Sequence, residues 1–189
     1  MKSRSIIIVF IVFVLVLAGA GVAYFLFAPQ AQDEVGMSAA GVTASSEEDK
    51  KAPDFTALDQ QGEEVSLSSL EGKPVIINFW TSWCTYCKQE MADFEQAYKT
   101  YGDRIDFMIL NATTDSKESM SKAESYIESK GFDLPFYFDT TGQATELYSI
   151  TVYPTTYFID AQGNIVGEHP GLMDAETIDE TCEILLGNY

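Results

Sequence analysis

Basic side chains are scarce in this sequence of 189 residues. It contains 11 Lys and Arg against 29 Asp and Glu, which gives a formal net charge of −18 at pH 7. Because Lys2 and Arg4 precede the acidic part, residues 29–189 carry nine basic and 29 acidic side chains, a net charge of −20. A surface this acidic repels phosphate backbones, which argues against nucleic-acid binding. The hydrophobic content of 46% is ample for one packed domain, so the chain is not expected to be disordered as a whole.

Cysteine and histidine are also rare, with three copies and one copy. A four-ligand zinc site would need every one of them, namely Cys84, Cys87, His169 and Cys182. Zinc ribbons use two close ligand pairs, whereas twelve residues separate His169 from Cys182. The sequence therefore predicts no metal site.

Two of the cysteines are close together, in Trp83-Cys84-Thr85-Tyr86-Cys87. The motif follows the apolar run 74–80 and precedes the helix-like run 88–101, which places it at a junction between a strand and a helix. The first N–H groups of a helix are unpaired and carry partial positive charge, so a thiolate at Cys84 is favoured. We predict that Cys84 is an exposed, low-pKa nucleophile and that Cys87 is the buried resolving cysteine.

The alternative for this pair is a structural disulfide. Side chains three residues apart on a first turn lie about 5–6 Å apart, which is close enough for a disulfide. In the chain-entropy model a four-residue loop contributes only about 1.9 kcal/mol of stability, against about 3 kcal/mol for fifteen residues. A bond that stabilises so little is better suited to exchange, so we interpret Cys84 and Cys87 as redox-active.

The motif and its surroundings resemble the thioredoxin superfamily, and within it the membrane-anchored, extracytoplasmic TlpA/ResA-like thiol-disulfide oxidoreductases. The resemblance extends from about Ala52 to the C-terminus. The segments that carry it are Ala-Pro-Asp-Phe at 52–55, Leu-Glu-Gly-Lys-Pro-Val at 70–75, Asn-Phe-Trp at 78–80, Trp-Cys-Thr-Tyr-Cys-Lys-Gln-Glu at 83–90 and Val-Tyr-Pro-Thr-Thr at 152–156. It implies an α/β thioredoxin-like fold, in which helices flank a mixed central β-sheet, with an N-terminal β-hairpin and an inserted helix of the TlpA-like type. It also implies that the Cys84–Cys87 disulfide is the redox centre and that no cofactor is bound.

The resemblance extends to residues beyond the cysteines. Pro154 is expected to follow a cis peptide bond and to face the cysteines, so that the backbone of Tyr153 can bind an extended substrate. Glu90 corresponds to the acidic residue that TlpA/ResA-like proteins place near the active site, where it would take the proton of Cys87. The alternative is that Glu90 is an ordinary first-turn acid that complements the helix dipole.

Other residues near the motif complete the predicted site. Trp83 is expected to shield the sulfurs and Trp80 to help cover them, with core packing as the alternative for Trp80. Thr85 and Tyr86 match neither the Gly-Pro pair of thioredoxin nor the Pro-His pair of DsbA, so the direction of electron flow stays open. Asn78 stands where thioredoxin has a buried acid, and an amide cannot serve as that proton acceptor.

The third cysteine and the histidine are assigned no part in the chemistry. Cys182 shares an apolar helical face with Ile178 and Leu185, which favours buried packing over redox use. His169 is predicted to be a surface residue at the end of a strand.

The N-terminal 28 residues are predicted to be a membrane anchor. Ile6 to Ala28 is a stretch of 23 residues without a charge, long enough as a helix to span about 30 Å of hydrocarbon. Basic residues before it and acidic residues after it place the domain outside the cytoplasm. The alternative is a signal peptide cleaved after Ala20, but the apolar run continues to Phe27. Residues 29–51 are predicted to be a flexible acidic tether and residues 52–189 the thioredoxin-like domain.

Hydrophobic periodicity predicts the elements of that domain. Strands are expected at 55–59, 63–67, 74–80, 106–111, 134–138, 155–159 and 165–166. A short helical turn is expected at 68–72, and helices are expected from about 84 to 101 and at 116–130, 142–150 and 174–186.

These features predict a reductase that acts on disulfides or oxidised thiols of exported proteins. The family resemblance implies substrates such as apocytochrome c or an exported methionine sulfoxide reductase. The chain has neither a Gly-rich dinucleotide motif nor a second Cys-x-x-Cys, so a reductase of this kind needs an external electron donor. The family resemblance implies that this donor is a CcdA/DsbD-like membrane protein. Three alternatives remain: a DsbA-like oxidase, a peroxiredoxin-like peroxidase and a redox-inactive binding module. The peroxidase lacks support because Thr81-Ser82-Trp83-Cys84 is without the proline of the Pro-x-x-x-Thr-x-x-Cys loop. The binding module fits poorly with an intact cysteine pair.

Overall fold

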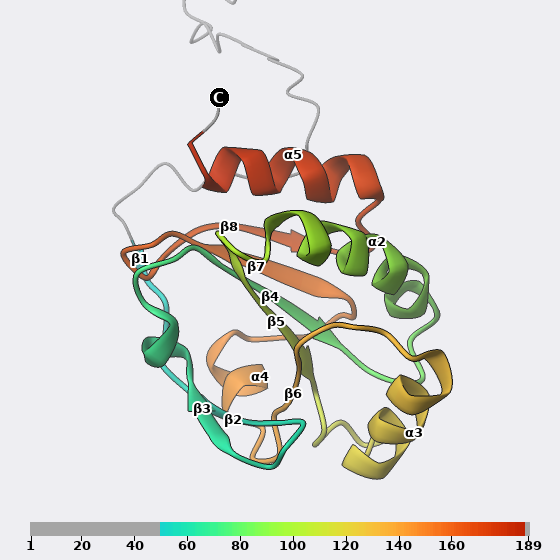
Figure 1. The fold of residues 1–189 in the computed structure, drawn as a ribbon. Helices are drawn as coiled ribbons and strands as arrows, with labels where there is room; N and C mark the ends of the chain where they lie inside the picture. Colours follow the sequence, from blue (N-terminus) through green and yellow to red (C-terminus); the bar gives the residue numbers. More distant parts are fainter. Residues whose placement is uncertain (1–49, 188–189) are drawn as a thin grey trace, which may run out of the picture. The chain divides into compact units, whose positions relative to one another are not determined.

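The computed structural model describes residues 50–187, which form one sheet with helices on both faces (Figure 1). The strands are β1 (Lys50–Lys51), β2 (Thr56–Asp59), β3 (Glu64–Ser66), β4 (Val75–Trp80), β5 (Asp106–Asn111), β6 (Phe136–Phe138), β7 (Thr155–Ile159) and β8 (Asn164–Pro170). The helices are the 3-10 helix η1 (Leu67–Leu70) and the α-helices α2 (Thr85–Tyr101), α3 (Met120–Lys130), α4 (Gln143–Leu147) and α5 (Ala175–Leu185).

The sheet is mixed, as predicted. Its strand order is β1-β8-β7-β4-β5-β6-β2-β3. The central strand β4 pairs in parallel with β5 and antiparallel with β7. Helices α2 and α5 lie together on one face, while α4 lies on the opposite face (Figure 1). The predicted α/β architecture is therefore confirmed.

All six residues of β4 are buried, and its alternating side chains serve two separate cores. Ile76 and Trp80 pack in the core that contains α2 and α5, together with both active-site cysteines. The other three apolar residues pack in the core that contains Tyr148 of the α4 region; they are Val75, Ile77 and Phe79. Asn78 lies on the same side of the strand as Ile76 and Trp80, so this one polar residue points toward α2.

Most predicted elements are present, but several boundaries differ. Lys50–Lys51, assigned to the tether, form β1 and pair with β8. Strand β8 continues to Pro170, well beyond the predicted 165–166. Helix α3 begins at Met120 rather than Ser116, because Ser119 is its N-cap and accepts a hydrogen bond from the Lys122 N–H. The chain between β5 and Ser119 is therefore a loop.

The predicted anchor at residues 1–28 and nearly all of the tether at 29–51 lie outside the described residues. Within residues 50–187, no helix has the length and apolar character needed to cross a bilayer.

Candidate active site

Cys84 and Cys87 form a disulfide at the start of α2, with their Cα atoms 5.3 Å apart. Cys84 is the N-cap residue, and its Sγ accepts a hydrogen bond from the Cys87 N–H at 3.0 Å. A helix-start amide directed at a sulfur is the arrangement that stabilises a thiolate. The geometry therefore supports Cys84 as the nucleophile.

The accessibility of the two sulfurs differs less than expected. Cys84 is 4% exposed and Cys87 is fully buried. The prediction of an exposed Cys84 is therefore wrong for the disulfide form, in which its Sγ faces Cys87 and the first turn of α2. Cys84 is nevertheless the only one of the pair that solvent reaches.

Glu90 lies one turn beyond Cys87 and points into the core, where it is fully buried. Its Oε1 accepts a hydrogen bond from Asn78 Nδ2 at 2.8 Å, and its Oε2 accepts one from the Met173 N–H at 3.1 Å. Burial raises the pKa of Glu90 from 4.5 to about 7, although both hydrogen bonds act in the opposite direction. The first turn of α2 contains no acidic residue. The helix-dipole alternative is therefore wrong for Glu90.

Asn78 connects three elements below the cysteines. Besides its bond to Glu90 on α2, its Nδ2 donates to Thr156 Oγ1 of β7 at 3.0 Å. Its Oδ1 is buried and has no hydrogen-bond partner. Asn78 thus fixes the Glu90 carboxylate, while Glu90 is the group of the two that can take a proton.

The loop before β7 contains the predicted cis peptide bond, between Tyr153 and Pro154. The Pro154 carbonyl accepts a hydrogen bond from the Gly171 N–H at 2.8 Å. Among the described residues, the Tyr153 amide and carbonyl make no backbone hydrogen bond. The pairing of these groups with an extended substrate stays a prediction.

The two tryptophans occupy different environments. Trp83 is 41% exposed and packs edge-to-face against Tyr153, with ring centroids 5.9 Å apart. Trp80 is fully buried, donates from Nε1 to the Ile109 carbonyl and packs against Phe136. Trp83 therefore lies on the surface and contacts Tyr153, while its shielding of the sulfurs stays a prediction. The core-packing alternative holds for Trp80.

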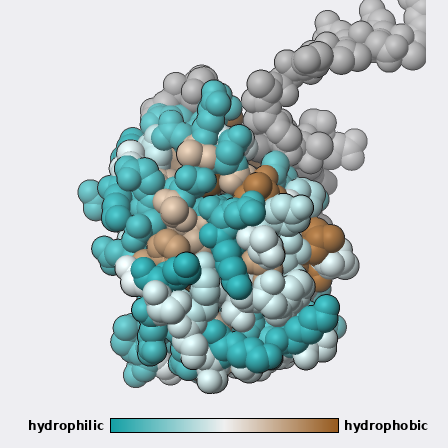
Figure 2. Space-filling view, turned by 90° about the vertical axis from the view of Figure 1, so that its right-hand side faces the viewer, coloured by the Kyte–Doolittle hydropathy of each residue, from teal (hydrophilic) through white to brown (hydrophobic). Residues whose placement is uncertain are grey.

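The two residues between the cysteines are on the surface. Thr85 and Tyr86 are exposed, Tyr86 to 60%. Two further apolar side chains are exposed: Val152, two residues before Pro154, and Leu172, directly after Gly171. Figure 2 shows the side of the molecule on which α3 lies; its hydrophobic surface is broken into small patches between hydrophilic side chains.

Two acidic residues that the apolar pattern did not indicate, Glu118 and Asp115, hold the loop before Cys84. Glu118 Oε1 accepts a hydrogen bond from Ser82 Oγ at 2.9 Å, and its Oε2 accepts one from the Ser82 N–H. Asp115 Oδ1 accepts a hydrogen bond from Trp83 Nε1 at 3.0 Å. The apolar periodicity predicts a helix from 116, which puts Glu118 in a helix and not in the loop where the structure places it. Ser119, a good N-cap, was the signal that the helix begins later.

The remaining cysteine and the histidine stay outside the chemistry. Cys182 is buried in α5, and burial raises the pKa of its thiol to about 12, which confirms the packing role. His169 is the second-last residue of β8, as predicted for a strand end, and is half-buried, with Nε2 3.3 Å from the Leu172 carbonyl. In residues 50–187 no three His, Cys, Asp or Glu side chains are arranged to hold a metal ion.

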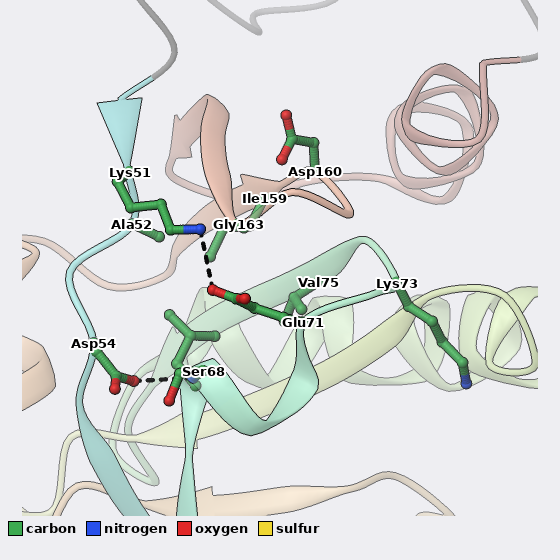
Figure 3. A pocket seen from close by; sticks show the side chains of 11 residues that line it. Lys51, Ala52, Asp54, Ser68, Glu71, Lys73, Val75, Ile159, Asp160 and Gly163 are labelled. Atoms are coloured by element: carbon green, nitrogen blue, oxygen red, sulfur yellow. Dashed lines mark hydrogen bonds and ion pairs between the residues drawn. The ribbon is translucent and has the colours of Figure 1, made fainter.

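A pocket of about 280 Å³ lies at the other end of β4 (Figure 3). It adjoins Val75, the first residue of that strand, so the strand separates it from the cysteine end by roughly 17 Å. Its polar groups already pair with one another: Lys51 with Glu71 at 3.0 Å, and the Ser68 N–H with Asp54 at 2.9 Å. The pocket therefore has no part in the cysteine chemistry.

Comparison with known proteins agrees with this geometry. Residues 49–167 match the AhpC/TSA family. The chain belongs to that family. "Thioredoxin-like protein YneN" of Bacillus subtilis is 31% identical over 138 residues, which cover 73% of this chain and 80% of that protein. "Thiol-disulfide oxidoreductase ResA" of the same organism is 30% identical over 139 residues, covering 73% and 75%.

A solved structure supports the same assignment. The exposed lipoprotein thioredoxin Etrx1 of Streptococcus pneumoniae superposes with a TM-score of 0.64 at 30% identity, covering 70% of this chain and 99% of that one. The ResA-like assignment and the thioredoxin-like fold are thus confirmed, and the chain is a thiol-disulfide oxidoreductase with Cys84–Cys87 as its cysteine pair.

Proposed function

We propose that this oxidoreductase is a reductase outside the cytoplasm, which donates two electrons from Cys84 and Cys87 to disulfides or oxidised thiols of exported proteins. The observation that carries this proposal is the fully buried Glu90, one turn beyond Cys87. When ionised, a buried carboxylate so close to the cysteine pair disfavours a second negative charge on the sulfurs. Strong oxidants such as DsbA do the reverse, because they stabilise their reduced form.

The proposed exchange proceeds in two steps. The Cys84 thiolate attacks a substrate disulfide, forms a mixed disulfide and releases one substrate sulfur as a thiolate. The Cys87 thiol then gives its proton to Glu90 and attacks Cys84 Sγ, which breaks the mixed disulfide and releases the second substrate sulfur. Two electrons have passed to the substrate, and the Cys84–Cys87 disulfide has formed. A pKa of about 7 suits Glu90 to this proton transfer near neutral pH.

Substrate binding is proposed at the surface around Cys84. The free Tyr153 amide and carbonyl would pair with an extended substrate segment. Trp83 and Tyr86 are exposed and supply apolar contact area beside the sulfurs. Apocytochrome c and an exported methionine sulfoxide reductase both present the protein thiol chemistry that such a site would take.

The pair needs an external electron source, because one dithiol stores two electrons. The sequence contains neither a Gly-rich dinucleotide motif nor a second Cys-x-x-Cys. We therefore assign the recharging step to a CcdA/DsbD-like dithiol donor in the membrane. The uncharged stretch Ile6–Ala28 would hold the domain next to that donor. The description of the pneumococcal relative as an exposed lipoprotein supports an extracytoplasmic position.

The equilibrium of the full-length protein with reduced and oxidised glutathione tests the direction. A reductase is expected to have a potential near that of thioredoxin, about −270 mV, whereas an oxidase would lie near DsbA at about −120 mV. Replacing Cys84 with Ser controls for other thiols, since it should abolish both the glutathione equilibrium and the reduction of insulin disulfides. A potential near that of DsbA would favour the oxidase alternative.

A further inference from the structure

A second buried carboxylate lies beside the active-site loop, and the exchange steps above do not use it. Glu118 immediately precedes the N-cap of α3 and is 8% exposed. Both of its oxygens accept hydrogen bonds from Ser82, one from the backbone N–H and one from Oγ at 2.9 Å. Ser82 lies in the short loop between the end of β4 and Cys84.

The Glu118 carboxylate is held in one orientation. Its Oε1 also accepts the Ser119 N–H at 2.9 Å, and Asn111 Nδ2 makes a longer contact of 3.4 Å with Oε2. The Glu118 N–H itself donates to the Asp115 carbonyl at 2.9 Å, which closes the turn that presents the side chain. Four donors around one carboxylate leave it little freedom to move away from Ser82.

The same turn also holds Trp83. Asp115 Oδ1 accepts the Trp83 Nε1–H, and Lys117 Nζ lies 5.1 Å from the centroid of the indole ring. Residues 115–118, hereafter the 115–118 clamp, thus bind both residues that precede Cys84. These contacts fix the loop of Ser82 and Trp83, which leads directly into Cys84, the N-cap of α2.

The position of Glu118 also has an electrostatic consequence. Two residues of chain span at most about 7 Å, so a carboxylate bonded to Ser82 lies within roughly 10 Å of Cys84. At that distance and an effective dielectric constant of about 20, one charge changes the ionisation of a thiol roughly tenfold. The nearby charges of Asp115 and Lys117 have opposite signs, and Lys88 is exposed on α2. Glu118 is the buried charge of this group.

We propose that Glu118 is a positioning residue of the redox site, which fixes the loop before Cys84 and disfavours the Cys84 thiolate, so that the cysteine pair becomes a stronger reductant. Reduction breaks the Cys84–Cys87 bond with two electrons, and two protons are taken up when both sulfurs become thiols. A thiolate at Cys84 would stabilise this reduced state, and the Glu118 charge opposes it. That a stronger reductant is useful to the protein rests on the proposed reductase function. The effect of Glu118 on the dithiol–disulfide equilibrium of Cys84 and Cys87 does not depend on that function.

The test is the glutathione equilibrium of the full-length protein carrying Glu118→Gln, which keeps the shape and removes the charge. The equilibrium is expected to shift about tenfold toward the reduced form, equal to about 30 mV in the oxidising direction. Alkylation of reduced Cys84 by iodoacetamide at pH 6 should accelerate by a similar factor. Glu128→Gln makes the same charge change at an exposed position of α3 and should alter neither value. An equilibrium equal to that of the Glu128 control would overturn the proposal.

A second variant covers the case in which Glu118→Gln does not fold. Glu118→Asp keeps the charge and withdraws it from Ser82 by only one methylene, so its equilibrium is expected to stay within about twofold of the wild-type value. A tenfold shift in Glu118→Asp, which keeps the charge, contradicts the electrostatic effect assigned to Glu118. The absolute potential of the unmodified protein tests the reductase function separately: a wild-type potential near that of DsbA, together with a tenfold shift in Glu118→Gln, would remove the proposed function and retain the role of Glu118.

Discussion

The carboxylate of Glu90, three residues after Cys87 on α2, accepts a hydrogen bond from the side-chain amide of Asn78 at 2.8 Å inside the core. An amide at position 78 leaves Glu90 as the titrating member of this pair. One buried carboxylate whose pKa is raised to about 7 can then exchange a proton near neutral pH. Two buried carboxylates would instead share one proton.

Glu90 is expected to make both exchange and stability depend on pH. The carboxylate is the proton acceptor, so the rate of mixed-disulfide release should rise as pH increases through about 7 and should lose this rise in Glu90→Gln. Because the pKa is higher in the folded state than in the unfolded state, folding binds a proton between about pH 4.5 and 7. As the pH rises from about 4.5 to 7, the free energy of unfolding of the wild-type protein should therefore fall relative to that of Glu90→Gln, by on the order of 3 kcal/mol.

Stopped-flow release of a mixed disulfide and urea unfolding at pH 5 and pH 8 measure the two effects. Glu128→Gln, on the exposed side of α3, serves as the control for the loss of one charge. A pH–rate profile that is identical in wild type and Glu90→Gln would show that Glu90 takes no proton in the exchange.

Cys84 is expected to react first with limiting iodoacetamide when the protein is reduced. It is the N-cap residue with an amide directed at its sulfur, whereas Cys87 and Cys182 are fully buried. Peptide mapping by mass spectrometry identifies the labelled residue. Preferential labelling of Cys87 or Cys182 is incompatible with the assigned nucleophile.

The two tryptophans should separate stability from activity. Trp80→Ala removes a fully buried ring from the core and is expected to cost about 3–5 kcal/mol of unfolding free energy. Trp83→Ala should cost only about 1 kcal/mol but raise the KM for a protein disulfide substrate by roughly fivefold, because it removes an exposed contact surface. Urea unfolding and insulin reduction measure the two quantities. A large loss of stability in Trp83→Ala with an unchanged KM would assign that ring to packing instead.

Cys182 is expected to be dispensable for the chemistry. Cys182→Ala should leave insulin reduction unchanged, whereas Cys182→Ser should be less stable by about 1–3 kcal/mol because it buries a hydroxyl group in the core around α5. Comparing activity with thermal unfolding in both variants checks this. Reduced activity in a stable Cys182→Ala protein would reveal a redox role.

The sequence was sufficient for the features that depend on local pattern. Apolar runs located β4, β5 and β7, and the cysteine spacing at a strand-to-helix junction located the start of α2. The cis bond before Pro154 was predicted from the resemblance to a known family. These features can be predicted without knowing which residues far apart in the chain are in contact.

The contacts that could not be predicted join residues far apart in the chain. Ser82 and Glu118 are 36 residues apart, and Glu90 and Met173 are 83 apart. No periodicity encodes such pairs, and the contact of Glu118 also depended on a helix that begins four residues later than its apolar pattern indicated. The extent to which Cys84 is buried likewise depends on tertiary packing.

The in-cell redox state of Cys84 and Cys87 tests the reductase account most directly. Cells expressing the full-length protein are quenched with acid and labelled with a thiol-reactive mass tag, with Cys182→Ala as the background so that only the pair is counted. In a reductase the pair is expected to be mainly reduced in growing cells and to become oxidised when the membrane dithiol donor is deleted. A pair that is oxidised in growing cells and indifferent to the donor would contradict the reductase function.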